Sequence, residues 1–216
     1  MKFVFDFCII YALSETIRQV AGGCALAKVD MVIILDSSTS VGIANFDKMK
    51  DFCKDLLRNA DLDSGNVRVG MLSYSTAVRV EFYLNSFSTS QEILDAIDNI
   101  PYRYGSTNTA DSLQRMREEM FSVANGDRRG VPDICLILTD GVSNINSRRT
   151  IPEAGKSRDA GIHIYAIGIG LRDTRELDGI ASVPSRENSF NVQSFDELSV
   201  LSDRVLDAFC PDDSTS

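Results

Sequence analysis

The sequence predicts an α/β fold: a doubly wound, mostly parallel sheet with one antiparallel edge strand and helices on both faces. Segments with strand and helix periodicity alternate from Val29 to Phe209, which is typical of such folds. Val29–Leu35 is a predominantly apolar run, as expected of a parallel strand that is covered on both faces. A length of 216 residues suits one domain with a sizeable core.

The first half of the chain contains three expected strands and two expected helices. After Val29–Leu35, apolar residues recur at spacings of three and four, which predicts a helix. That stripe consists of Phe46, Met49, Cys53 and Leu56. Val78–Leu84 alternates and follows a short turn, so we expect it to be the antiparallel edge strand. The remaining elements are the strand Val67–Ser73 and the short helix Gln91–Ile97.

The second half continues the alternation after a polar loop, Tyr104–Thr109. Ser194–Glu197 has the pattern of a capping box, which predicts the start of a final helix. That helix would carry an apolar stripe of Phe195, Leu198, Leu201, Val205 and Phe209. The other expected elements are a helix with Leu113, Met116 and Met120 on one face, the strand Asp133–Leu138, a helix over Pro152–Ala160, and the strands Ile162–Ile167 and Ser189–Val192.

The two ends of the chain differ in composition from the rest. Lys2 precedes an apolar run, Phe3–Leu13, and small residues follow at Ala21–Gly23, so residues 1–23 resemble a secretory signal peptide or leader. A poorly ordered leader and a lipoprotein signal ending at Cys24 remain alternatives. The run is too short to span a bilayer, so no membrane insertion is expected. Residues 211–216 form a polar tail.

Charge and cysteine content narrow the function classes. The net charge is −9 and no basic cluster exceeds a pair, which argues against a nucleic-acid partner. Cys24 and Cys210 bracket the predicted domain, and their placement suggests a disulfide between its two ends. Cys53 and Cys135 lie on apolar faces and are expected to be buried thiols, with a second bridge as the alternative.

One turn concentrates hard oxygen ligands at the carboxyl end of the first strand. Asp36, Ser38 and Ser40 provide one carboxylate and two hydroxyls there, which suits a cation such as Mg²⁺. Ligands of doubly wound sheets bind beyond the carboxyl ends of the strands. Asp140 follows a later strand, and the loop with Thr107 leads into a helix, so both can reach the same edge. We therefore expect all five residues to meet at one cation site.

Enzymatic readings of these motifs are weaker, and the chain is not expected to be an enzyme. Phosphotransferases that use a nucleophilic Asp need a second Asp two residues later, where Ser38 stands. No Gly-x-Ser-x-Gly is present, and the single histidine, His163, lies within a strand. Gly168-Ile-Gly170 lacks the third glycine of a dinucleotide-binding loop, because Asp173 occupies that position.

The five residues and their spacing resemble the metal-ion-dependent adhesion site (MIDAS) of the von Willebrand factor type A domain. The matching segments are Asp36–Ser40, Thr107 in a Gly-rich loop and Asp140 in Leu138–Gly141. The likeness extends over about Val29 to Phe209, within an expected domain of residues 24–210. It is greatest to the A domains of matrilins and matrix collagens, in which a terminal disulfide is common.

The resemblance implies a secreted module of the extracellular matrix that uses a divalent cation. Mg²⁺ is expected, with Mn²⁺ or Ca²⁺ as alternatives. Ser38, Ser40 and Thr107 would coordinate the ion directly, and Asp36 and Asp140 would act through water. The open position would accept an acidic side chain of a partner such as collagen or another matrix protein. The alternative is a structural matrix component that assembles, with itself or with collagen, through a metal-independent surface.

Overall fold

Six strands form a single sheet in the computed structural model, which describes residues 28–58, 60–201 and 205. The strands are β1 (Val29–Asp36), β2 (Val67–Tyr74), β3 (Val78–Phe82), β4 (Asp133–Thr139), β5 (His163–Ile169) and β6 (Ser189–Val192). Their order is β3-β2-β1-β4-β5-β6, with only β3 antiparallel to its neighbour. The sheet confirms the predicted fold class, including the antiparallel edge strand.

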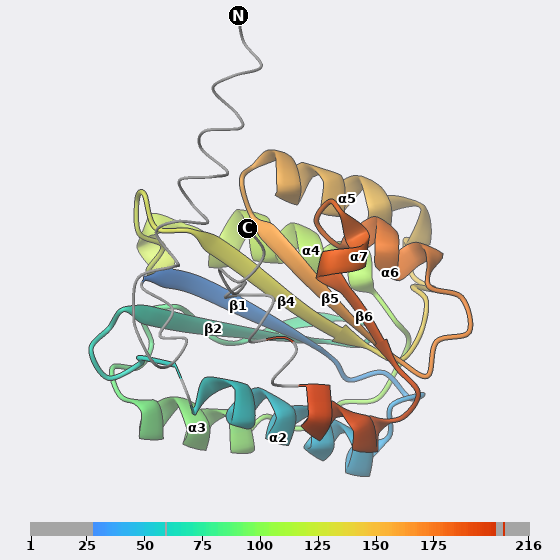
Figure 1. Cartoon of the computed structure of the whole chain (residues 1–216), viewed down its shortest axis with the longest axis horizontal. Coiled ribbons are helices and arrows are strands. Elements are labelled where there is room, and N and C mark those ends of the chain that lie inside the picture. The colour runs from blue at the N-terminus through green and yellow to red at the C-terminus, as the bar shows by residue number, and fades with distance from the viewer. Residues whose placement is uncertain (1–27, 59, 202–204, 206–216) are drawn as a thin grey trace, which may run out of the picture.

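Helices cover both faces of this sheet (Figure 1). The helices α2 (Ile43–Leu57) and α3 (Ser90–Asp98) lie on one face. The other face carries α4 (Thr109–Arg115), which continues as a π-helical turn over Met116–Met120, together with α5 (Ser147–Asp159) and α6 (Arg175–Ile180). Shorter elements are the helix α7 (Ser185–Asn188) and the 3₁₀ turns Val123–Asn125 and Phe195–Glu197.

Two apolar cores flank the central strand β1. Met31, Ile33 and Leu35 belong to the core beneath α2, and Val32 and Ile34 belong to the core on the α4 face. Successive side chains of a strand point to opposite faces, so a strand between two cores must be apolar at nearly every position. This explains the apolar run that predicted β1.

Two local predictions need correction. The helix expected from Pro152 begins at Ser147, so that Pro152 lies inside α5 and leaves one helical hydrogen bond unmade. The expected capping box at Ser194 does not form, because the Ser194 side chain caps no backbone N–H and Glu197 Oε2 accepts the Gln193 N–H at 2.9 Å. A complete capping box instead joins Thr89 and Glu92 at the start of α3.

Several predictions concern residues outside the described part of the chain. These are the leader 1–23, the tail 211–216, the Cys24–Cys210 disulfide and the end of the final helix with Phe209. Cys53 and Cys135 are described, and both are buried free thiols in different cores, as predicted. No helix within the described residues combines the length and the apolar character needed to cross a bilayer.

Candidate metal centre

The topology of the sheet brings the two predicted aspartates to neighbouring strand ends. The chain builds β1, β2 and β3 toward one edge and β4, β5 and β6 toward the other, so the strand order reverses between β1 and β4. Asp36 is the last residue of β1, and Asp140 directly follows β4. When the connections after two adjacent parallel strands run in opposite directions, a crevice forms at the carboxyl ends of those strands. Ligands of such folds bind in that crevice.

Asp36 is fully buried and accepts hydrogen bonds on both carboxylate oxygens. Its Oδ1 accepts the Ser38 N–H at 2.8 Å. Its Oδ2 accepts the hydroxyls of Thr139 at 2.8 Å and Tyr74 at 3.3 Å. Burial raises the pKa of Asp36 to about 6, although the hydrogen bonds from Ser38 and Thr139 oppose that shift. The carboxylate is therefore fixed in place, and no basic side chain within the described residues forms an ion pair with it.

The hydroxyls of the same turn link this aspartate loop to the second aspartate. Ser38 Oγ lies 3.1 Å from Ser40 Oγ, and Ser40 Oγ donates a hydrogen bond to Asp140 Oδ1 at 2.8 Å. Burial raises the pKa of Asp140 as well, with the Ser40 hydrogen bond acting in the opposite direction. Four of the five predicted residues thus form one continuous polar chain.

The donor set and its spacing fit a small hard cation. Every donor is a carboxylate or hydroxyl oxygen, the ligand type that Mg²⁺ and similar ions prefer. In an octahedral shell with bonds of 2.0–2.1 Å, adjacent oxygens lie about 3 Å apart. The 3.1 Å between the two serine hydroxyls matches that spacing.

Thr107, the fifth predicted residue, is buried and is positioned through its backbone. Its N–H donates to Asn144 Oδ1 at 2.9 Å, and its carbonyl accepts the N–H groups of Asn144 and Ile145 at 3.0 and 3.1 Å. The Thr107 loop is also tied to the serine loop, because Thr39 and Gly105 exchange two hydrogen bonds of 2.9 Å. Among the described residues, no hydrogen bond joins the Thr107 hydroxyl to the other four predicted ligands.

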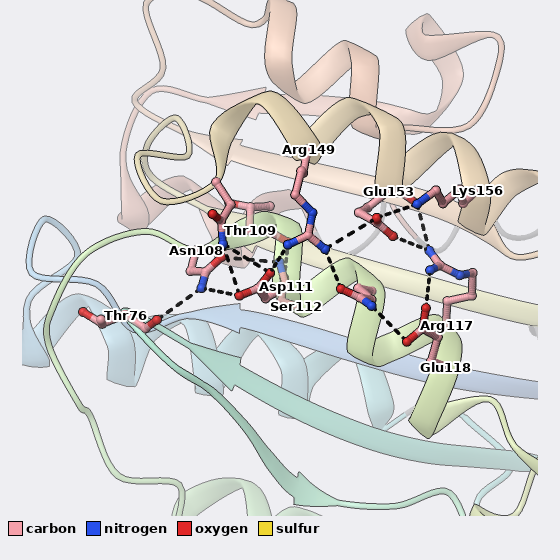
Figure 2. A network of polar contacts seen from close by, with 12 residues as sticks. Thr76, Asn108, Thr109, Asp111, Ser112, Arg117, Glu118, Arg149, Glu153 and Lys156 are labelled. Carbon is pink, nitrogen blue, oxygen red and sulfur yellow. Dashed lines mark hydrogen bonds and ion pairs between the residues drawn. The ribbon is translucent and has the colours of Figure 1, made fainter.

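A polar network anchors the helix that begins directly after Thr107 (Figure 2). Asn108 caps α4 and donates from Nδ2 to Thr76 O at 3.2 Å and to Asp111 Oδ2 at 2.8 Å. Arg149 of α5 donates to Asp111 Oδ1 at 2.9 Å and lies 3.6 Å from the buried Glu153 carboxylate. These contacts hold the start of α4 against both the β2–β3 turn and α5, and so limit movement of the Thr107 loop.

Sequence reasoning did not identify three residues that support this centre: Tyr74, Thr139 and Asn144. Tyr74 pairs in register with Asp36, so a correct alignment of β1 and β2 would have indicated it. Thr139 immediately precedes Asp140 at the end of β4. Asn144 has no sequence signal, because its contact with Thr107 depends on how two loops meet.

A separate acidic group lies at the amino ends of the strands, at the other end of the sheet from the metal centre. Asp30, Asp127 and Asp133 have carboxylate oxygens within 4.8 Å of one another. Arg128 already neutralises Asp30 with a 2.8 Å hydrogen bond from Nε. Burial and the neighbouring Asp127 raise the pKa of Asp133 to about 7. Asp30 is the second residue of β1 and Asp133 the first of β4, so this group is distinct from the centre at the carboxyl ends of the strands.

Comparisons with known proteins agree with this fold. A family model described as the von Willebrand factor type A domain matches residues 30–204. The collagen alpha-4(VI) chain of Mus musculus is 33% identical over 201 residues, which cover 92% of this chain and 9% of that protein. Matrilin-3 of Mus musculus is 32% identical over 193 residues, which cover 88% of this chain and 40% of that protein.

A solved structure resembles the chain over a similar extent. It is proximal thread matrix protein 1 from the mussel byssus, with a zinc-occupied MIDAS motif. The two share 31% identity with a TM-score of 0.80, over 88% of this chain and 50% of that one. The present chain therefore spans half or less of the length of each of these three relatives.

Proposed function

The chain belongs to the von Willebrand factor type A domain family, and on that premise we propose that it is a secreted adhesion module of the extracellular matrix. It captures an acidic side chain of a matrix protein through a divalent cation. The observation that carries this proposal is the continuous polar chain from Asp36 through Ser38 and Ser40 to Asp140.

The proposal assigns a separate role to each type of oxygen in the centre. Ser38, Ser40 and Thr107 would coordinate the cation directly, and Asp36 and Asp140 would hold it through water. Mg²⁺ is the ion we propose, with Mn²⁺ or Ca²⁺ as alternatives. When bound, the ion offers an open position of positive charge to a carboxylate oxygen of the partner.

The chain's own residues keep that position electrophilic. Neutral hydroxyls donate electron density without cancelling the charge of the ion. Thr139 and Tyr74 donate hydrogen bonds to the Asp36 carboxylate and so fix its orientation. Outer hydrogen bonds of this kind determine how well a metal ligand is positioned.

The relatives support a location in the matrix. Matrix collagens, matrilins and a byssal matrix protein share this domain. The proposed secretion would use residues 1–23 as a leader, and an oxidising compartment would permit the Cys24–Cys210 disulfide. A domain shared with longer matrix proteins can act as their binding module or as a structural unit, and the two roles differ in their need for a cation.

A solid-phase binding assay separates these roles. Purified protein is applied to immobilised collagens and other matrix proteins in Mg²⁺ and in EDTA, beside a Ser38→Ala variant. We expect at least one ligand to bind in Mg²⁺, and we expect EDTA or the substitution to abolish that binding. Binding that persists unchanged in EDTA would instead support assembly through a metal-independent surface.

A further inference from the structure

A groove runs beside the amino half of β2, away from the metal centre at the carboxyl ends of the strands. β3 pairs with β2 only over Met71–Tyr74, so within the described residues no strand faces Val67–Gly70 on that side. The space left there has a volume of about 320 Å³, which lies in the range of small binding sites. We call this space the edge groove; its apolar walls include the side chains of Leu62, Phe87 and Ile93.

The backbone of β2 presents hydrogen-bonding groups to the edge groove. Val29 of β1 donates its N–H to Asn66 O at 3.1 Å, whereas the N–H of Val67 points away from β1 and donates to Asp61 O at 3.0 Å. Alternate residues of a strand share an orientation, so the N–H and C=O groups of Val69 also point away from β1, into the groove. No strand in the described part of the chain pairs with them. An unpaired strand edge of this kind is a template for an added strand.

The walls of the edge groove favour an apolar side chain. Val67, Val69, Leu62 and Ile93 belong to one apolar core, so this face of β2 is the apolar one. The Phe87 side chain is 36% exposed, and its ring packs edge-on against a core phenylalanine with the centroids 5.3 Å apart. An exposed aromatic ring that is held at the mouth of a groove can bury the side chain of a ligand.

Arg68 gives the other face of the groove a positive charge. Its side chain leaves β2 on the opposite face from the two valines, and Nη1 donates to Gly126 O at 2.7 Å. In the part of the chain that the structure describes, no carboxylate forms an ion pair with Arg68. Asp63, the acidic residue that lines the groove, accepts the N–H and the hydroxyl of Ser90 instead, at 2.7 and 3.0 Å. The guanidinium is therefore available to a carboxylate that a ligand brings.

We propose that the edge groove binds an extended segment of another protein as an added strand, and that this segment carries a glutamate or aspartate next to an apolar residue. Successive side chains of an added strand point to opposite faces, as those of β2 do. The apolar residue packs against Leu62, Phe87 and Ile93, and its acidic neighbour reaches Arg68. In this mode of recognition the backbone hydrogen bonds supply affinity, and the alternating side chains supply specificity. The site is separate from the metal centre, so binding here needs no cation.

A peptide display screen in EDTA tests the edge groove separately from the metal centre. Short random peptides are selected on the purified protein, and a selected peptide is then synthesised with one backbone nitrogen methylated at a time. Arg68→Gln is the test variant, because glutamine keeps an N–H donor and removes the charge. Arg79→Gln is the matched control: Arg79 is an exposed residue of β3 that does not line the groove.

We expect the wild-type protein and Arg79→Gln to enrich peptides in which an acidic residue adjoins an apolar one. Arg68→Gln should bind such a peptide about tenfold more weakly, the lower end of the effect expected for a hydrogen bond between charged groups. Methylation should abolish binding at every second peptide position, because alternate N–H groups of an added strand face β2. In NMR spectra of the wild-type protein, the Val69 amide resonance should shift when the peptide is added.

The results that would overturn the proposal leave the metal centre untouched. Equal affinities of Arg68→Gln and Arg79→Gln for the selected peptide would reject the acidic contact. Methylation that is tolerated everywhere, or an unshifted Val69 amide, would reject the added strand. Failure to select any peptide in EDTA would reject the edge groove as a peptide site, and a wild-type protein that sediments as a dimer in that case would assign the groove to a second copy of the chain.

Discussion

Thr139→Val removes one hydroxyl beneath the proposed metal centre and keeps the shape of the side chain. The lost group donates to Asp36 Oδ2 at 2.8 Å and accepts the Gly141 N–H at 3.3 Å. A hydrogen bond to a charged group contributes about 1.5–3 kcal/mol to stability, so we expect the free energy of unfolding to fall by that amount. Loss of a supporting hydrogen bond typically lowers metal affinity by about 10–100-fold.

Thr150→Val provides the matched control for this substitution. Thr150 is also fully buried, and its hydroxyl lies 2.7 Å from Ser143 Oγ without touching any proposed metal ligand. Removing that hydroxyl should lower stability by about 0.5–1.5 kcal/mol, as for a neutral hydrogen bond. Mg²⁺ affinity should remain at the wild-type value.

Two assays on both variants decide the outcome. Urea denaturation in EDTA gives the free energy of unfolding without metal, and isothermal titration gives the dissociation constant for Mg²⁺. Equal Mg²⁺ affinities for Thr139→Val and Thr150→Val would refute the reasoning, because the contact between Thr139 and Asp36 would then have no part in metal binding.

Three further predictions concern the rest of the molecule. Asp133 has a folded pKa of about 7 against an ordinary value of 3.8, so the stability held by its protonated form is fully present below about pH 4 and is lost as the pH rises through 7. Asp133→Asn should remove that loss and stabilise the protein above pH 7 by about 1–2 kcal/mol after solvent screening; a variant with an unchanged pH profile in urea denaturation would contradict this. Arg128→Met leaves the buried Asp30 carboxylate unpaired and should cost about 3–5 kcal/mol, again by denaturation, whereas a loss under 1 kcal/mol would show that Asp30 finds other partners. Burial raises the pKa of both the Cys53 and Cys135 thiols, so mass spectrometry should detect alkylation of these residues only after unfolding, and rapid labelling of the native protein would be inconsistent with their burial.

Much of the fold could be predicted because its strands lie between two cores. Burial on both faces makes β1 and β4 almost uniformly apolar, and that pattern is visible in the sequence. The sequence predicts a helix over Pro152–Ala160, but α5 begins five residues earlier, at Ser147, because the helix accommodates Pro152 in its interior. Ser194–Glu197 has the sequence pattern of a capping box, but Glu197 accepts the Gln193 N–H instead. The sequence pattern alone therefore does not ensure that a capping box forms.

The candidate site could be predicted in part, because three of its residues are neighbours in sequence and the fold class locates a fourth. Asp36, Ser38 and Ser40 lie on one turn, and the rule that ligands bind at strand ends locates Asp140 beside them. The supporting contacts of Asn144 and Tyr74 depend on loop geometry and strand register, which a single sequence does not encode in any local pattern. Tyr104, at a φ of 40°, likewise owes its strained conformation to hydrogen bonds from its two neighbours to a loop more than sixty residues earlier in the chain.

Direct calorimetric titration of Mg²⁺ into the wild-type protein and into Asp140→Ala tests the central claim most directly. Asp140 is only partly buried, so its removal should leave the fold intact, unlike removal of the fully buried Asp36. The account predicts saturable binding at a single site in the wild-type protein, and an affinity lowered by at least about tenfold in the variant. Equal Mg²⁺ affinities for the two proteins, or no binding by the wild-type protein, would contradict it.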